Sequence, residues 1–194
     1  MPLSVKLLIA EFAFLPLAAG LIWVFPPPGE AMRWAISWQG LAWTIVFFAP
    51  LWACVWMVQP SVRRAIPGVA SIYNALANGP LGELIRHGST GLFFMLSLMA
   101  GIGEELLMRG FFQPHFGLLI TAAIFGLCHA LTPAYFIFSA IFCLYLGVLY
   151  EYTSQMLVIP IAIHSGYDFM MLCVYRRQFR REAVVDTEAS DQSV

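Results

Sequence analysis

Residues 90–112 read TGLFFMLSLMAGIGEELLMRGFF. The stretch is apolar over enough length to cross a bilayer, for which a helix needs about 20 residues. Within it lie two adjacent glutamates, Glu104 and Glu105, and one arginine, Arg109. Ionisable groups inside a membrane are costly and usually mark a functional site. The stretch therefore predicts a transmembrane helix that also carries chemistry.

The rest of the chain shares this apolar character. Its 194 residues are 60% hydrophobic and only 11% charged, whereas soluble domains carry about 25% charged residues. Backbone groups cannot stay unpaired in lipid, so apolar segments of this length must be helices. The predicted fold class is an all-α polytopic membrane protein. We expect six membrane-spanning helices, at roughly residues 5–25, 34–58, 90–112, 117–131, 133–151 and 156–175.

Residues 59–89 differ from these segments, because they mix charged and apolar residues and contain helix breakers. The apolar positions from Ile66 to Ile85 suggest short amphipathic helices on the membrane surface, and an ordinary loop is the alternative. We expect residues 1–181 to form a single transmembrane helical domain, with the motif core in residues 90–175. The polar segment 182–194 is predicted to be a disordered tail.

The basic residues predict an orientation. If the N-terminus is cytoplasmic and six helices alternate, eight of the ten basic residues lie inside, as the positive-inside rule requires. Arg33 then lies in an outer loop and Arg109 within a helix. We expect an integral protein of a bacterial inner membrane with both termini in the cytoplasm. The eight basic residues on that side are Lys6, Arg63, Arg64, Arg86, Arg176, Arg177, Arg180 and Arg181.

Other ionisable or reactive residues receive structural interpretations. The net charge of −1 gives no reason to expect a nucleic-acid partner. The four cysteines lie in apolar stretches without paired spacing, which favours neither a disulfide framework nor a zinc site. Glu151 falls at a helix end and can reach the interface. Glu11 lies inside the first apolar segment, where we expect a structural hydrogen bond.

Helix geometry separates the two adjacent glutamates. Glu105 and Arg109 are four residues apart and share a helix face, so they are expected to pair. Glu104 is rotated by about 100° from Glu105 and is left without that partner. A carboxylate in apolar surroundings, unpaired with a cation, can act as a base near neutral pH. One glutamate is therefore predicted to be structural and the other available for chemistry.

Depth along the helices brings four polar residues into one layer. At ~1.5 Å per residue, Glu104 lies roughly 20 Å above the inner surface, and His129 roughly 16 Å. His164 lies roughly 22 Å up and Asp168 roughly 16 Å. We expect the side chains of Glu104, His129 and His164 to converge on a water-sized gap, with Glu104 and His129 about 5–6 Å apart across one water.

Several chemistries suit these groups. A glutamate can deprotonate a water while a histidine shares the proton and later protonates a leaving amine. A second histidine and its neighbour one turn away can bind an oxyanion, so peptide hydrolysis fits. The same groups are plausible metal ligands, although the HExxH and Glu-x-x-His patterns are absent. A proton-coupled transporter and purely structural polar pairs are the other interpretations.

Three motifs together resemble a known family. They are Glu104-Glu105-x-x-x-Arg109 with Gly110 after it, Phe125-x-x-x-His129, and His164-x-x-x-Asp168. In this order, on separate helices, they look like the CPBP family of type 2 CAAX proteases and bacteriocin-processing enzymes, also called the ABI family. The resemblance spans residues 104–168, about a third of the chain, and implies a glutamate-type intramembrane endopeptidase.

The resemblance also implies a role for each motif residue. A glutamate activates water with help from the first histidine, the adjacent glutamate and the arginine organise the site, and the last motif forms the oxyanion hole. The implied catalytic residues are thus Glu104, His129, His164 and Asp168, with Glu105, Arg109 and Phe125 as structural support.

The last motif departs from the family, which often has Asn where this chain has Asp168. An ionised aspartate repels an oxyanion. Either Asp168 is protonated, or it orients His164, or the oxyanion-hole assignment fails in this chain.

The glutamate mechanism requires no metal and no cofactor, although the family was long labelled metal-dependent and zinc is the alternative. The expected partners are the lipid bilayer and a membrane-associated peptide or protein substrate, and prenylated CAAX substrates are not implied. The sequence assigns no oligomeric state. A non-catalytic immunity factor or membrane scaffold of the same fold is the other interpretation, against which the intact Glu104, His129 and His164 count.

Overall fold

The computed structural model describes residues 2–28, 32–34 and 37–191, and almost all of them are helical. The part of the chain that it describes contains no strand, only an isolated bridge between Arg33 and Met156. The predicted all-α fold class is confirmed. In chain order the elements are α1 (Leu3–Val24), α2 (Trp38–Phe48), the 3₁₀ turn η1 (Ala49–Leu51), α3 (Trp52–Met57), α4 (Pro60–Ala65), α5 (Pro67–Asn78), α6 (Pro80–His87), α7 (Thr90–Leu107), the π-helical turn η2 (Met108–Phe112), α8 (Gln113–Cys128), α9 (Pro133–Tyr152) and α10 (Val158–Asp191).

The described residues contain five helices long and apolar enough to cross a membrane. One of them, Thr90–Cys128, joins the third and fourth predicted segments, so the count differs from the expected six. The two parts separate at Gly117, whose φ of 78° is outside the helical region. The helix beyond Gly117 is only ~16 Å long at 1.5 Å per residue, too short to cross a bilayer alone.

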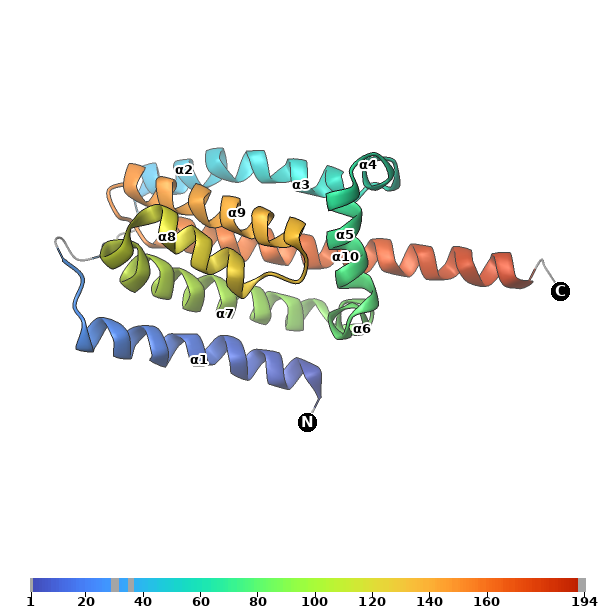
Figure 1. Ribbon diagram of the computed structural model, residues 1–194, viewed down its shortest axis with the longest axis horizontal. Helices are drawn as coiled ribbons and strands as arrows, with labels where there is room; N and C mark the ends of the chain where they lie inside the picture. The colour runs from blue at the N-terminus through green and yellow to red at the C-terminus, as the bar shows by residue number, and fades with distance from the viewer. Residues whose placement is uncertain (1, 29–31, 35–36, 192–194) are drawn as a thin grey trace.

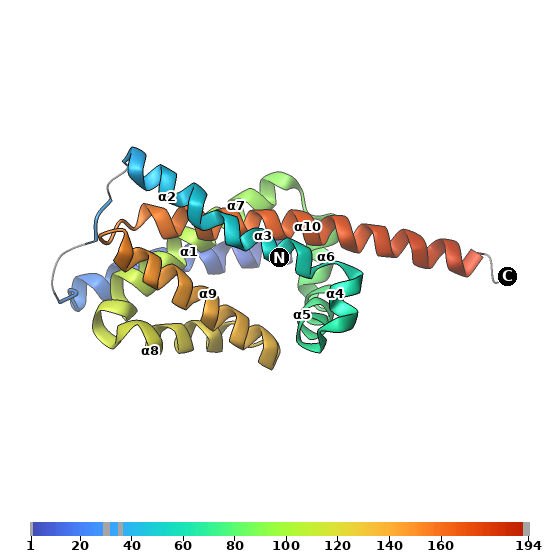
Figure 2. The same cartoon turned by 90° about the horizontal axis from the view of Figure 1, so that it is seen from above.

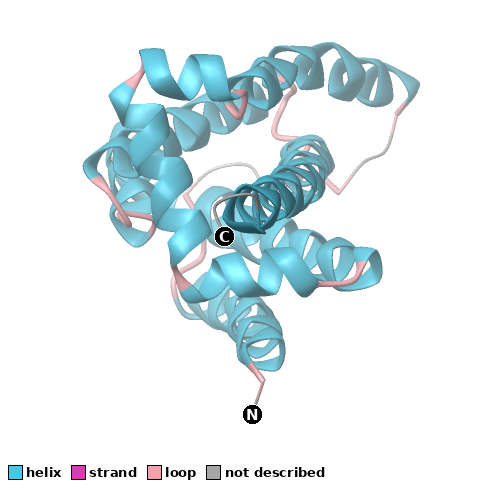
Figure 3. Ribbon diagram, turned by 90° about the vertical axis from the view of Figure 1, so that its right-hand side faces the viewer, coloured by secondary structure: helices cyan, strands magenta, loops and turns pink. Residues whose placement is uncertain are grey.

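The long helices form an elongated bundle, and α4, α5 and α6 lie across one end of it (Figure 1). Both chain termini lie at this same end, which we call the α4–α6 end. Seen from above, α8 lies beside α9 and stops well short of the α4–α6 end (Figure 2). Viewed from the α4–α6 end, α10 occupies the middle of the bundle (Figure 3). It contacts α7, α2, α6 and α9, and α1 packs on the other side of α7.

The helix ends follow ordinary local signals. The side chain of Ser89 accepts a hydrogen bond from the Leu92 N–H at 3.1 Å, and that of Thr132 accepts one from the Tyr135 N–H at 3.1 Å. Such side chains replace the partners that the first N–H groups of a helix lack. Helices α4, α5 and α6 each begin with proline, which is favoured at the first helical position.

The helical interpretation of residues 59–89 is confirmed by α4–α6. Arg63 of α4 forms an ion pair with Glu182 of α10 and lies 3.5 Å from the ring centroid of Tyr73. The Tyr73 hydroxyl, on α5, donates to the other Glu182 oxygen at 2.7 Å. Helix α10 continues to Asp191, into the segment predicted as a tail. Residues 192–194 of that segment lie outside the described part of the chain.

Two glycines of α7 allow its neighbours to approach closely. A Cβ atom on Gly101 would lie 2.1 Å from the Ser165 hydroxyl oxygen and 2.9 Å from its backbone nitrogen. A Cβ atom on Gly103 would lie 2.9 Å from the Cβ of Phe14 and 3.2 Å from the carbonyl oxygen of Glu11. The backbones of α10 and α1 therefore pack against α7 immediately before the two adjacent glutamates.

Candidate active site

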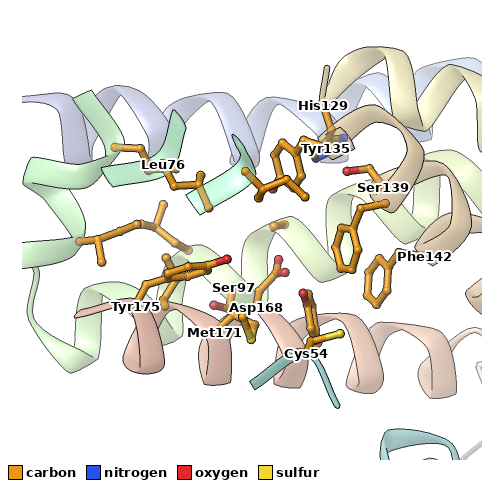
Figure 4. Close-up of a pocket in the computed structure, with 18 of the residues that line it drawn as sticks. Cys54, Leu76, Ser97, His129, Tyr135, Ser139, Phe142, Asp168, Met171 and Tyr175 are labelled. Carbon is orange, nitrogen blue, oxygen red and sulfur yellow. The ribbon is translucent and has the colours of Figure 1, made fainter. Parts of the chain in front are cut away.

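Polar side chains from α7, α8 and α10 meet at a cavity of about 290 Å³ inside the bundle. Glu104, His129, His164 and Asp168 all line it. Figure 4 shows His129 and Asp168 on opposite sides of this cavity. Toward the α4–α6 end its wall is almost wholly apolar, with side chains of α5, α6 and α10. The structure thus brings together the four residues that the motifs indicate.

Glu105 and Arg109 form the ion pair expected from their spacing. The Arg109 Nε atom lies 3.1 Å from Glu105 Oε2, and both side chains are essentially inaccessible to solvent. A second Arg109 nitrogen donates to the Cys143 carbonyl oxygen of α9 at 2.9 Å. Arg109 lies in the π-helical turn η2, a distortion that often occurs near functional sites. Arg109 therefore links Glu105, near the end of α7, to Cys143 of α9.

Glu104 points away from this pair and into the cavity. Its side chain is 9% exposed, and its Oε2 atom is buried without a hydrogen-bond partner. That oxygen lies 3.9 Å from His129 Nε2 and 3.8 Å from His164 Nε2. Both distances exceed a hydrogen bond. The separation of Glu104 and His129 is also shorter than the expected 5–6 Å.

The hydrogen bonds of the two histidines determine which nitrogen faces the cavity. The Nδ1 of His129 lies 2.9 Å from the Phe125 carbonyl oxygen, which requires an Nδ1–H donor there. The remaining Nε2 faces Glu104. The Phe125 ring stacks on the His129 imidazole at a centroid distance of 4.3 Å, so Phe125 holds this histidine in two ways.

His164 is held in a similar manner by a different group. Its Nδ1 lies 2.8 Å from Glu105 Oε1, so it donates to that carboxylate and leaves Nε2 facing the cavity. Asp168, one turn further along α10, has its Oδ2 3.5 Å from the same Nε2. Glu105 therefore links the arginine and the second histidine in one buried network.

Sequence reasoning missed the position of Glu11. Its side chain lines the same cavity as Glu104 and Asp168. Its Oε2 atom is buried and has no hydrogen-bond partner, so the structural bond expected at this position is not made by that oxygen. The available signal was an ionisable residue in the middle of an apolar segment, which is unusual in a membrane helix.

The cavity is lined by histidine and carboxylate side chains, which are also common ligands of zinc. Within the described residues, no group of three or more histidine, cysteine, aspartate or glutamate side chains has the geometry to hold a metal ion. Zinc requires three or four ligand atoms about 2.0–2.3 Å from one point.

Residues 86–170 match the family model described as Type II CAAX prenyl endopeptidase Rce1-like. The matched segment runs from α6 into α10 and contains all three motifs. No curated protein and no solved structure matches the chain. The match agrees with the resemblance carried by the motifs. The segment that contains the three motifs, residues 86–170 of this membrane protein, is therefore similar to the Rce1-like family of type II CAAX prenyl endopeptidases.

Proposed function

We propose that the protein is an intramembrane endopeptidase that hydrolyses a peptide bond of a membrane-associated substrate with water activated by Glu104. The observation that supports this most directly is the environment of Glu104 Oε2. This oxygen is buried, lacks a hydrogen-bond partner and lies within 4 Å of two imidazole nitrogens from different helices. An unpaired carboxylate in such surroundings is suited to removing a proton from water.

In the first step, Glu104 takes a proton from water and the hydroxide attacks the carbonyl carbon of the scissile peptide. His129 Nε2 is free to accept a hydrogen bond from the same water, because its Nδ1–H is used by Phe125. The proton then passes from Glu104 to the leaving amine as the C–N bond breaks. The products are a carboxylic acid and an amine.

His164 is assigned to the oxyanion that develops on the carbonyl oxygen. Its Nδ1–H is bound to Glu105, so the oxyanion role requires the imidazolium form of His164, whose second N–H, at Nε2, points into the cavity. A donor fixed before the reaction stabilises the oxyanion without further reorganisation. Arg109 keeps the Glu105 carboxylate in place and thereby fixes the ring of His164.

The substrate is expected to bring apolar groups into the cavity, because its wall toward the α4–α6 end is apolar. We assign the α4–α6 end to the cytoplasm of a bacterial inner membrane. This end carries both termini and the basic residues of α4 and α6, as the positive-inside rule requires.

A comparison of cells that express wild-type protein or a Glu104→Gln variant tests the proposal. New protein N-termini generated by cleavage should appear in wild-type membranes and be absent from Glu104→Gln membranes at equal protein levels. The matched control is Glu83→Gln on α6, whose glutamate is 70% exposed and outside the cavity. Cleavage that persists in the Glu104→Gln variant would contradict the assignment. Identical termini in all three strains and in cells lacking the protein would instead favour a non-catalytic role.

A further inference from the structure

The cavity contains a carboxyl group that the proposed mechanism does not use. Glu11 comes from α1, which packs against α7 through Gly103. A Cβ atom at Gly103 would lie 2.9 Å from the Cβ of Phe14 and 3.2 Å from the Glu11 carbonyl oxygen, so a larger residue there would force α1 to shift. The sequence of α7 therefore permits Glu11 to stand beside Glu104 and Asp168, with its Oε2 buried and unpartnered.

The charges that face Glu11 do not balance three ionised carboxylates. On α7 its neighbour is Glu104, and on α10 they are His164 and Asp168, all in electrostatic contact with Glu11. The arginine of the first motif, Arg109, is already bound to Glu105. Carboxylates that share an apolar site cannot all ionise, so at least one keeps a proton.

The other titratable side chains at the cavity do not supply the missing positive charge. Five of them can only become negative when they lose a proton: Cys54, Tyr73, Tyr135, Tyr167 and Tyr175. His129 uses its Nδ1–H for the Phe125 carbonyl and presents Nε2 toward Glu104, on the side of the cavity opposite Asp168 (Figure 4). His164 is the only imidazole within 4 Å of Asp168 among the described residues. One imidazole therefore faces the carboxyl groups of Glu104 and Asp168 together.

We propose that Glu11 and Asp168 carry one proton in total, that this proton resides on Asp168 and makes it an O–H donor to the oxyanion, and that the negative charge of Glu11 makes Glu11 the positioning residue that keeps the proton there. The proposal rests on the proposed function for the existence of an oxyanion, whereas the shared proton stands on its own. No covalent bond to the pair changes, and the proton remains on it throughout hydrolysis.

The distance between Asp168 and His164 gives the reason why this proton matters. Asp168 Oδ2 lies 3.5 Å from His164 Nε2, the nitrogen assigned to the oxyanion. An ionised Asp168 would repel the oxyanion and also attract the Nε2–H away from it. With a proton on the Glu11–Asp168 pair, both donors remain available for the reacting carbonyl.

Measurements of kcat against pH test whether Glu11 controls the proton on Asp168. The proteins compared are the wild type, Glu11→Gln, Asp168→Asn and the double variant. Glu11→Gln removes a neighbouring negative charge, so Asp168 should lose its proton at lower pH. The alkaline limb of the pH profile of kcat should move to lower pH. At pH values above that limb, kcat should fall by up to roughly 10²–10³-fold, the usual effect of losing one oxyanion donor. In the Asp168→Asn background a permanent N–H donor is present, so that limb and the sensitivity to Glu11→Gln should both disappear. Equal losses in both backgrounds would overturn the proposal.

A matched control separates this effect from a disturbance of the cavity. Ser97 of α7 also lines the cavity and has a buried hydroxyl without a partner, but it carries no charge. Ser97→Ala should leave the alkaline limb of kcat at its wild-type pH. A displacement equal to that of Glu11→Gln would mean that packing, and not a proton, is responsible, and would contradict the proposal.

Infrared spectroscopy tests the shared proton without any catalytic activity. In the Glu104→Gln variant at neutral pH, the spectrum should contain the carbonyl band of a protonated carboxyl group in an apolar environment. Adding Glu11→Gln should remove that band, and adding Ser97→Ala should not. If no such band exists in the Glu104→Gln variant, the shared proton is refuted. If Glu104→Gln retains protease activity, the proposed function fails while the infrared result still decides the pair.

Discussion

Replacing Glu105 by glutamine removes one half of an ion pair that is almost completely buried, with side-chain exposures of 0% for Arg109 and 1% for Glu105. Arg109 would keep its bond to the Cys143 carbonyl but lose its counter-charge. Breaking a buried pair by removing one partner typically costs about 3–5 kcal/mol. Since each 1.4 kcal/mol is a factor of ten, the folding equilibrium should shift by roughly 10²–10³·⁵-fold.

Unfolding in mixed detergent micelles, followed by far-ultraviolet circular dichroism as the fraction of denaturing detergent rises, measures this loss. The matched control is Glu104→Gln, which changes an adjacent and similarly buried carboxyl that is in no such pair. It should cost much less and abolish cleavage. An Arg109→Met variant should lose about as much stability as Glu105→Gln, and the double variant less than the sum, because the two residues interact directly. A Glu104→Gln protein less stable than an active Glu105→Gln protein would reverse the roles assigned here.

Four other outcomes are expected. Reporter fusions within residues 26–33 and 152–155 should lie outside the cytoplasm, and an external C-terminus would refute the orientation. Purified protein should keep its activity after exhaustive chelation, whereas loss that zinc reverses would replace the glutamate mechanism with a metal-dependent one. Activity should fall as the pH is lowered, because a protonated Glu104 cannot accept a proton from water, and a profile without an acidic limb would exclude it as the base. Gly101→Ala should destabilise the bundle by about 1–3 kcal/mol, since its Cβ would lie 2.9 Å from the Ser165 backbone nitrogen, and an unchanged unfolding curve would contradict that contact.

The sequence predicted those parts of the site that depend on helix periodicity. The four-residue spacing of Glu105 and Arg109 leads directly to the observed ion pair. The common depth of Glu104, His129 and His164 is likewise set by helix rise, and their side chains do meet. These features follow from one helix at a time, so a single sequence contains enough information to predict them.

Features that depend on contacts between distant segments were not predicted. Glu11 reaches the cavity only because α1 packs closely against Gly103, and neither residue alone indicates that contact. The turn at Gly117 lies within an apolar run, where composition does not reveal a change of direction. Glu182 was placed in a polar tail, yet it bonds to α4 and α5. Its partners are more than a hundred residues away in the sequence, beyond the reach of local patterns.

The contacts of Glu182 have a mechanical consequence. Tyr73 lines the cavity from α5, and its hydroxyl donates to the carboxylate of Glu182 on α10, a helix whose C-terminal part projects beyond the bundle (Figure 1). Burial raises the pKa of Tyr73, so the hydroxyl remains a donor to Glu182 at any physiological pH. Glu182 of α10 therefore holds Tyr73, and with it this part of the cavity wall, in place. A chain shortened after Arg181 would keep every motif residue but lose the hydrogen bond between Glu182 and Tyr73. The width of the cavity would then depend on a residue that does not contact the substrate.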